Sequence, residues 1–63
     1  MAVHEHLDQL EHLDVDAARL VKLRYFAGMS MDQTAAALGL SRRSAERLWT
    51  FAKAWLRDAM RPG

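Results

Sequence analysis

The stretch SMDQTAAALGLSRRSAERLW, residues 30–49, decides the fold, because signals for two helices stand on either side of one glycine. Ser30 followed three residues later by Gln33 is a capping-box pattern, which predicts the start of a short helix. Gly39 can take positive φ without steric cost, and Ser41 is a favourable N-cap for a second, longer helix. A short helix, a turn that contains glycine and a longer helix together predict a helix-turn-helix.

The apolar residues around this turn fit the packing that a helix-turn-helix requires. Two helices that cross steeply need a small residue where they meet, and Ala35 supplies one. Leu38 and Leu40 flank the turn and can anchor it to a core. Ala45 and Leu48 are expected to face inward from the longer helix. The alternative at this level is a plain helical hairpin in a small bundle.

The remainder of the chain predicts two further helices and no strands. Residues 3–13 carry apolar side chains at spacings of three or four, which is the helical period. These apolar positions are Val3, Leu7, Leu10 and Leu13. Asp14 is a suitable N-cap for a helix over residues 15–27, with Gly28 as its C′ residue. That second helix is apolar on more than one side, which is typical of a central element packed against two others.

We therefore predict an all-α, four-helix domain that spans residues 1–63, with its helix-turn-helix over about residues 31–60 and no wing. A chain of 63 residues suffices for one small domain. It contains no cysteine, which excludes disulfides and thiolate metal sites. No apolar run approaches the length of a membrane span, and the acidic residues 1–16 lack the pattern of a signal peptide. We expect a cytoplasmic protein without a membrane segment.

Charge is distributed unevenly along the sequence. Residues 1–16 carry a net charge of −5, residues 17–41 carry +2 and residues 42–63 carry +4. Such asymmetry favours an anionic partner at the C-terminal half. The alternative is an ordinary solvated surface.

The basic residues of the longer helix are expected to share one exposed face. If Ala45, Leu48 and Ala52 point inward, an outward stripe remains, and a helix-turn-helix protein lays the N-terminal part of such a helix in the DNA major groove. The candidate DNA-binding residues are Arg42, Arg43, Ser44, Glu46, Arg47, Thr50, Lys53 and Arg57. Arginine can bind guanine through two hydrogen bonds, and glutamate can accept one from cytosine. Lys53 and Arg57 are better placed for phosphates.

Two arginines stand at an unfavourable helix end. Arg42 and Arg43 fall in the first turn after Ser41, where the helix dipole disfavours each cation by ~0.3–1 kcal/mol. A phosphate or a guanine would relieve this repulsion. Glu46 lies amid these cations, and we expect it either to read a cytosine or to orient a neighbouring arginine.

Other residues capable of chemistry do not form a recognisable site. Trp49 and Trp55 could stack on bases, but in so small a domain they are expected in the core. His4, His6 and His12 are spaced so that they diverge on a helix, and we expect no metal site. No nucleophile motif is present, so we expect neither an enzyme nor a cofactor.

Residues 18–56, ARLVKLRYFAGMSMDQTAAALGLSRRSAERLWTFAKAWL, resemble region 4 of bacterial RNA polymerase sigma factors. The segments LRYFAG, TAAALGLS and AKAWL are similar to the extracytoplasmic-function (ECF) group, and to a subgroup of it abundant in planctomycete-like bacteria. The resemblance implies a four-helix domain whose last two helices bind the −35 element of double-stranded promoter DNA. It also implies an apolar groove that docks on the flap-tip helix of the β subunit in the RNA polymerase core. Arg42, Arg43, Ser44, Glu46 and Arg47 match the family's DNA-reading segment by position.

The sequence departs from the family pattern at three places. Family members usually carry Thr-Val-Lys where residues 44–46 of this chain are Ser-Ala-Glu, so an anion replaces a cation at a reading position. Leu48 replaces a residue that is often polar, and Val15 replaces a frequent proline. Region 2 of the sigma factors, which melts promoters and binds the polymerase core, is not part of the resemblance. We therefore expect a C-terminal fragment of a longer sigma factor.

Three interpretations of function follow. The first is binding of promoter DNA by a monomeric domain. The second is a protein-interaction module that holds the polymerase flap helix or an anti-sigma factor, which the acidic N-terminal segment and the apolar second helix favour. The third, drawn from related helix-turn-helix families, is the DNA-binding end of a response regulator, which binds paired half-sites as a dimer.

Overall fold

Four helices make up the part of the chain that the structure describes. The computed structural model gives the backbone of residues 2–61 and the side chains of residues 5–61. The helices are α1 (Ala2–Leu13), α2 (Val15–Tyr25), α3 (Met31–Leu38) and α4 (Arg42–Ala59). Residues 2–61 contain no strand, and hence no wing. The all-α, four-helix fold predicted from the sequence is confirmed.

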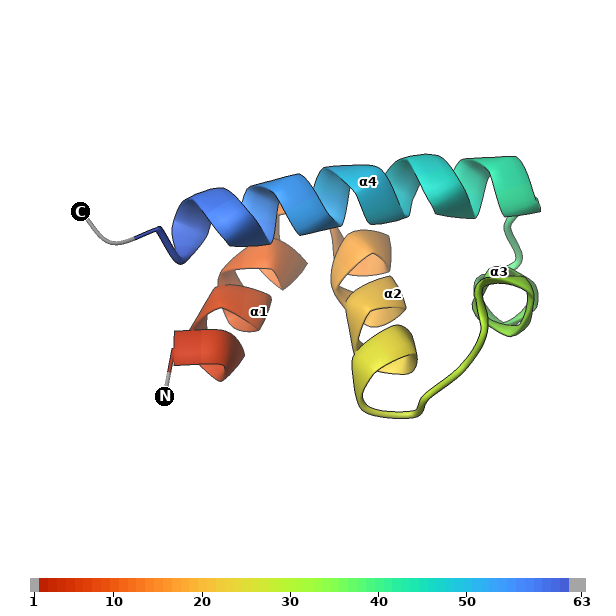
Figure 1. Cartoon of the computed structure of the whole chain (residues 1–63), viewed down its shortest axis with the longest axis horizontal. Coiled ribbons are helices and arrows are strands. Elements are labelled where there is room, and N and C mark those ends of the chain that lie inside the picture. The colour runs from red at the N-terminus through yellow and green to blue at the C-terminus, as the bar shows by residue number, and fades with distance from the viewer. Residues whose placement is uncertain (1, 62–63) are drawn as a thin grey trace.

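The longest helix, α4, lies across the other three. Figure 1 shows α1 beneath its C-terminal half, α2 beneath its middle and α3, seen nearly end-on, beneath its N-terminal end. α2 contacts α1, α3 and α4, which confirms the central position predicted for it. The Cα trace measures 35 × 20 × 18 Å along its principal axes, and α4 runs along the longest of them (Figure 1).

The starts of α2 and α3 are stabilised by the side chains that the sequence indicates. Asp14 accepts a hydrogen bond from the backbone N–H of Ala17 at 3.1 Å. Ser30 and Gln33 complete the capping box at the start of α3. The Ser30 hydroxyl oxygen accepts from the Gln33 N–H at 3.1 Å, and the Gln33 side-chain oxygen accepts from the Ser30 N–H at 2.9 Å. These bonds satisfy donors that the first turn of a helix leaves without partners.

The second helix ends earlier than the sequence predicts. Its last residue is Tyr25 and its C-cap is Phe26, which is two residues before the predicted end. Gly28 does take positive φ, 67°, but it lies in the turn beyond the cap. The guanidinium of Arg24 holds this turn, because its Nη1 donates to the Met29 carbonyl at 2.8 Å.

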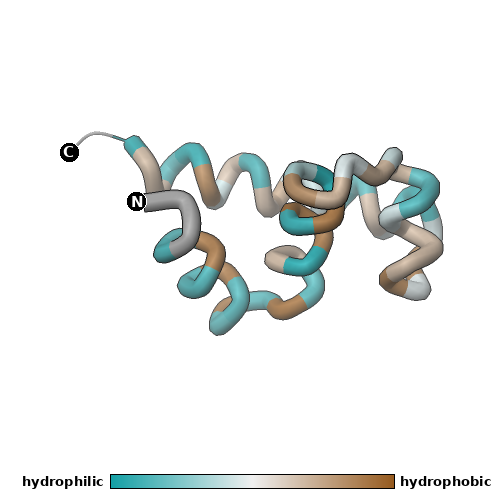
Figure 2. The backbone as a smooth tube through the Cα atoms, turned by 90° about the horizontal axis from the view of Figure 1, so that it is seen from below, coloured by the Kyte–Doolittle hydropathy of each residue, from teal (hydrophilic) through white to brown (hydrophobic). Residues whose placement is uncertain are grey.

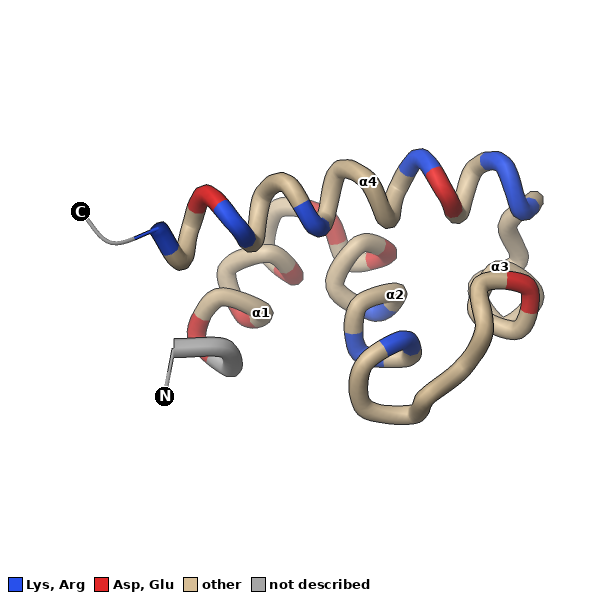
Figure 3. Tube along the Cα trace, viewed as in Figure 1, with Lys and Arg blue, Asp and Glu red and all other residues tan. Residues whose placement is uncertain are grey.

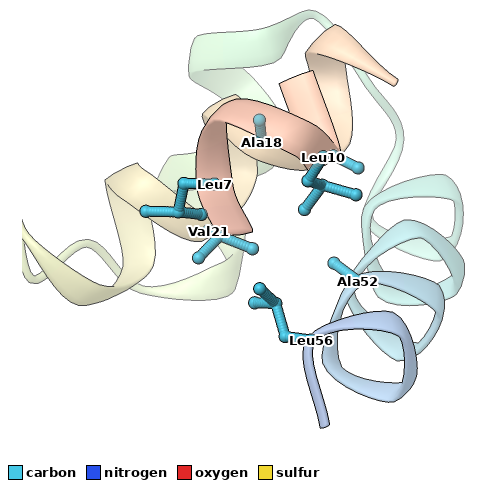
Figure 4. Packing of buried hydrophobic residues seen from close by; sticks show 7 residues of the cluster. Leu7, Leu10, Ala18, Val21, Ala52 and Leu56 are labelled. Carbon is cyan, nitrogen blue, oxygen red and sulfur yellow. The ribbon is translucent and has the colours of Figure 1, made fainter. Parts of the chain in front are cut away.

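The core consists of two clusters that meet along α4. The larger cluster joins α1, α2 and the second half of α4 (Figure 4). Its buried members are Leu7, Leu10, Ala17, Ala18, Val21, Ala52 and Leu56. The smaller cluster, Leu20, Ala35 and Ala45, joins α2, α3 and the first half of α4. Leu48 and Trp49 pack against both clusters, so the two halves of the molecule share one apolar interior.

The positions predicted to face inward from the helix-turn-helix do so. Ala45 and Ala52 are fully buried, Ala35 is 4% exposed and Leu48 is half-buried. Alanine has little bulk, so it lets the backbones of neighbouring helices approach closely. Leu13 was expected on the apolar face of the first helix but is 60% exposed, because α1 ends there and the chain turns into α2. The side chain of Val3 lies outside the described residues.

The aromatic residues divide between the core and the surface. Trp49 and Trp55 pack against the larger cluster, as predicted, and each is half-buried. Tyr25 and Phe26 are 65% and 62% exposed. Hydrophobic and hydrophilic residues follow one another along the helices (Figure 2). A domain of this size has too little interior for all of its large apolar side chains.

Candidate nucleic-acid interface

The turn between α3 and α4 sets the direction of α4. Gly39 has φ 70° and ψ 29°, a left-handed conformation that the absence of a Cβ permits. The N–H of Leu40 donates to the Ala35 carbonyl at 2.9 Å, which closes the end of α3. Ser41 then caps α4, because its hydroxyl oxygen accepts from the Ser44 N–H at 3.1 Å. Together these contacts form the helix-turn-helix that the sequence predicts.

All eight predicted DNA-binding residues lie at the surface of α4. The exposed residues are Arg42, Arg43, Ser44, Glu46, Arg47, Thr50, Lys53 and Arg57. The buried Ala45 and Ala52 mark the side of the helix that faces the core. Figure 3 shows cations along α4 and carboxylates on α1, which matches the uneven charge of the sequence. The exposed side of α4 is therefore accessible to an anionic ligand.

Three arginines of this set have no acidic partner in the described part of the chain. Among the side chains of residues 5–61, no carboxylate lies within ion-pair distance of Arg43, Arg47 or Arg57. A guanidinium in this state keeps its donors for an external acceptor, and phosphate or guanine suits its planar geometry.

Arg42 differs from these three, because two carboxylates hold its guanidinium. Its Nη1 donates to Asp32 Oδ1 at 2.8 Å, and its Nε donates to Glu46 Oε2 at 3.2 Å. The hydrogen bond to Glu46, followed by that to Asp32, raises the pKa of Arg42. All three side chains are more than half exposed, so water screens both pairs. Glu46 thus contacts one of the neighbouring arginines that the sequence predicts it to orient, while its alternative role as a reader of cytosine stays a prediction.

The two hydroxyl residues of the candidate site differ in the donors they retain. Ser44 Oγ accepts a hydrogen bond from the Ser41 hydroxyl at 3.0 Å, so the hydroxyl hydrogen of Ser44 remains available to a phosphate oxygen. Thr50 donates its hydroxyl hydrogen to the Glu46 carbonyl at 3.0 Å within α4. Thr50 therefore presents mainly its methyl group and an acceptor to the surroundings.

Lys53 lies against an aromatic ring. Its Nζ is 5.5 Å from the ring centroid of Trp49, and the Cζ of Arg24 is 5.3 Å from the same centroid. The Tyr25 ring is tilted by 49° to Trp49, with the two centroids 5.6 Å apart. The negative ring face attracts both cations. The contacts of Arg24 and Tyr25 with Trp49 could not be predicted from the sequence, because contacts between residues of different helices leave no periodic pattern in it.

An apolar groove with a cationic rim is formed by α1, α2 and the C-terminal half of α4. Its volume is about 1100 Å³. It is lined by Leu7, Val21, Tyr25, Phe26, Thr50, Lys53, Ala54, Leu56, Arg57, Met60 and Arg61. The charged residues of this lining are all cations, so the groove favours an apolar ligand with acidic flanks.

A smaller hollow lies on a different face of α4. It has a volume of about 430 Å³ and is lined by Asp14, Asp16, Leu40, Ser44, Arg47, Leu48 and Phe51. Arg47 shares this hollow with two carboxylates but forms no ion pair with either of them. Arg47 therefore remains free to turn toward an external ligand.

The described residues offer no metal centre and no membrane span. No three His, Cys, Asp or Glu residues among them lie close enough together to hold an ion. His6 and His12 belong to α1, whereas the side chain of His4 lies outside the described part. Within the same part of the chain, every helix is too short or too polar to cross a membrane.

An exposed basic helix that follows a glycine-containing turn defines the helix-turn-helix class of DNA-binding proteins. A family model described as "ECF sigma factor" matches residues 1–62. The chain therefore belongs to the extracytoplasmic-function sigma factor family. No curated protein and no solved structure matches the chain at a significant level.

Membership of this family establishes the broad role of the chain. Sigma factors act in transcription initiation, where they bind the RNA polymerase core and promoter DNA. They are transcription factors without catalytic activity of their own. The response-regulator interpretation is thereby set aside in favour of the sigma-factor interpretation.

Proposed function

We propose that this chain binds the −35 element of promoter DNA through the N-terminal half of α4, as region 4 of a sigma factor. Arg43 and Arg47 carry the proposal. Both are exposed on α4, away from the buried Ala45, and neither has a carboxylate partner among residues 5–61. Such guanidinium groups near the start of a recognition helix suit the major groove, where arginine binds O6 and N7 of guanine.

The other exposed residues of α4 support this contact in different ways. Arg57, and Lys53 once it leaves Trp49, can bind phosphates farther along the duplex and so position the helix. Ser44 can donate its hydroxyl hydrogen to a phosphate beside the helix start. Glu46 uses one carboxylate oxygen within the protein, and its other oxygen can accept a hydrogen bond from cytosine N4.

Alanine substitution tests the two arginines. We expect Arg43→Ala or Arg47→Ala to weaken binding to the preferred duplex by ~1–3 kcal/mol and to relax base preference at the contacted position. The preferred duplex is first selected from a random pool with the 63-residue chain. Affinities are then measured by fluorescence anisotropy at low salt, because so small an interface depends strongly on its phosphate contacts.

The matched control for this experiment is Arg19→Ala. Arg19 is also exposed, but it lies on α2. Its substitution should leave both the affinity and the base preference unchanged. If the two α4 variants bind the selected duplex as tightly and as selectively as the wild type, promoter recognition by this face of α4 is wrong.

The apolar groove supports a second function, which is docking on the RNA polymerase core. Tyr25, Phe26 and Met60 stand at this groove with 65%, 62% and 45% of their surface exposed. Exposed apolar patches of this kind mark interaction sites. An amphipathic helix such as the flap tip of the β subunit could lay its apolar anchors in the groove. An anti-sigma factor that used the same groove would compete with the polymerase.

Chemical-shift mapping separates the two functions. A flap-tip peptide should perturb the signals of Leu7 and Val21 at the groove, whereas the selected duplex should perturb those of Arg43 and Arg47. We expect both responses, since a sigma region 4 needs both surfaces. If the peptide perturbs the groove and DNA perturbs nothing in α4, docking is the sole function of this chain.

A monomer in the bacterial cytoplasm accommodates both functions. Promoter DNA and RNA polymerase meet there, and one copy of the chain carries both proposed surfaces. Light scattering coupled to size-exclusion chromatography should therefore give the mass of a single chain. A stable dimer would instead call for paired half-sites in the DNA.

A further inference from the structure

We propose that Asp32 of α3, together with Glu46, withholds Arg42 from DNA and thereby lowers the affinity of α4 for duplexes of every sequence. The inference rests on the proposed function, because it concerns how the same face of α4 meets a duplex. Asp32 is not among the residues that the sequence singles out. We refer to Asp32, Arg42 and Glu46 together as the carboxylate brace.

The guanidinium of Arg42 is poorly placed for a bidentate ligand. Arginine binds guanine or phosphate with two neighbouring N–H groups on one edge of its guanidinium. One edge carries Nε and Nη2, and the other carries Nη1 and Nη2. Glu46 takes Nε at 3.2 Å, which removes the first edge. Asp32 contacts Nη1 at 2.8 Å, which puts a carboxylate beside the second edge. Arg43 and Arg47 have no such contacts among residues 5–61.

The charge of the carboxylate brace also opposes a phosphate. The carboxylate brace, with two carboxylates and one guanidinium, carries a net charge of −1. A phosphate that approaches Arg42 therefore meets two like charges at short range. The same pairing relieves the repulsion between Arg42 and the positive end of the α4 dipole. Of the two arginines in the first turn, Arg43 is the one left for DNA.

The carboxylate brace connects the two helices of the helix-turn-helix. Asp32 lies in the first turn of α3, where the helix dipole favours a carboxylate. Arg42 is the first residue of α4. Their ion pair therefore spans the turn at Gly39, so removal of Asp32 frees the Nη1–Nη2 edge of Arg42 without removing any group of α4 itself.

Withholding one arginine has a definite consequence for the general affinity of the domain for DNA. Contacts to phosphate strengthen binding to every sequence alike and carry no base information. An Arg42 held by Asp32 and Glu46 adds nothing to that general affinity. A larger share of the remaining affinity then comes from base contacts, which in the proposed function are made by Arg43 and Arg47.

The test is Asp32→Asn in the 63-residue chain, with two duplexes as probes: the one selected by the wild type and a scrambled duplex of equal length and composition. We expect the variant to bind both duplexes several-fold more tightly, because an added phosphate contact strengthens binding to every sequence. The plot of log affinity against log salt should become steeper by about 0.9, the increment for one added phosphate contact. The ratio of the two affinities should stay unchanged, because the added contact carries no base information.

A double-mutant cycle distinguishes release of Arg42 from the mere loss of a negative charge. In an Arg42→Gln background, Asp32→Asn should change neither the salt slope nor the affinity for either duplex. If the effect of Asp32→Asn persists there, Asp32 acts by plain repulsion and the proposal is wrong. Arg42→Gln alone should leave the salt slope unchanged, and a slope shallower by about 0.9 would likewise overturn the proposal, since Arg42 would then already bind a phosphate.

Asp58→Asn is the matched control, because Asp58 is an exposed carboxylate paired with Arg61 at the opposite end of α4. It should leave the salt slope and the affinity for either duplex unchanged. The Nε–H resonance of Arg42 reports the carboxylate brace without DNA: it should be protected in the wild type and lose protection in Glu46→Gln. If the wild type binds no duplex at all, the proposed function fails, while this resonance still shows whether the brace forms.

Discussion

Thr34 illustrates how a single residue can limit stability. It is fully buried, and its hydroxyl oxygen has no hydrogen-bond partner among the described residues. A buried polar group without a partner costs about 1–3 kcal/mol, whereas the methyl group of the same side chain contributes to packing. We expect Thr34→Val to raise the free energy of unfolding by about 1 kcal/mol in chemical denaturation.

Thr34→Ser provides the opposite change at the same position. It keeps the hydroxyl group and removes the methyl group, so it should lower the free energy of unfolding by about 1 kcal/mol. DNA affinity should not change in either variant, because the side chain is enclosed in the core. A valine variant less stable than the wild type would mean that the hydroxyl group forms a compensating hydrogen bond in solution.

At the residue scale, the sequence predicts which side chains are exposed better than it predicts their partners. The exposure of Arg43 and Arg47 follows from the helical period, because Ala45 and Leu48 define the inward side. The contact between Asp32 and Arg42 does not follow, since the two residues are ten positions apart and meet only through the geometry of the turn. The contact of Lys53 and Arg24 with the Trp49 ring does not follow either, because Arg24 comes from a different helix, α2.

At the scale of the element, substitutions at the start of α4 should affect the stability of the domain and its DNA binding differently. Ser41→Ala removes the N-cap and should lower the free energy of unfolding by about 1 kcal/mol. Ser41→Asp keeps a capping oxygen and adds a carboxylate that the helix dipole favours. The aspartate variant should therefore unfold near the wild-type midpoint yet bind the selected duplex more weakly, because its charge lies beside Arg43.

Thermal unfolding and fluorescence anisotropy measure the two quantities on the same samples. Ser30→Asp at the start of α3 is a useful comparison, since it makes the same substitution at another N-cap. If Ser41→Asp binds the selected duplex as tightly as the wild type, the start of α4 does not approach phosphate in the complex.

Helix starts are predictable here because each depends on residues close together in the sequence. Asp14, Ser30 and Ser41 cap their helices as expected. The end of α2 was less predictable, because it depends on a hydrogen bond from Arg24 to the backbone beyond the helix. The exposure of Leu13 was also not predictable, because this residue satisfies the helical period but lies where the chain leaves the core.

At the scale of the whole molecule, salt should distinguish the two proposed surfaces. The exposed cations proposed to contact DNA are Arg43, Arg47, Lys53 and Arg57. If Lys53 and Arg57 neutralise phosphates while Arg43 and Arg47 contact bases, log affinity for the duplex should fall with log salt at a slope of about −2. Binding of a flap-tip peptide depends on apolar burial and should fall much less. Isothermal titration at several salt concentrations measures both slopes, and a duplex slope near zero would contradict the phosphate contacts.

The arrangement of the helices in space was predictable in outline only. The central position of α2 follows from its two apolar sides, and the pairing of α3 with α4 follows from the short turn between them. The residues that line the apolar groove do not follow, because they come from three helices and include Tyr25 and Phe26, which the period alone assigns to a packed interior. Competition among helices for a small core decides which aromatic residues remain outside.

The unbroken length of α4 has a mechanical consequence. Its 18 residues form a rod of about 27 Å, with the proposed DNA-reading residues near one end and the rim of the apolar groove near the other. Because α1, α2 and α3 all pack against α4, this helix tilts as one body with the rest of the domain. A partner bound in the groove would therefore set the angle at which the N-terminal end of α4 meets DNA.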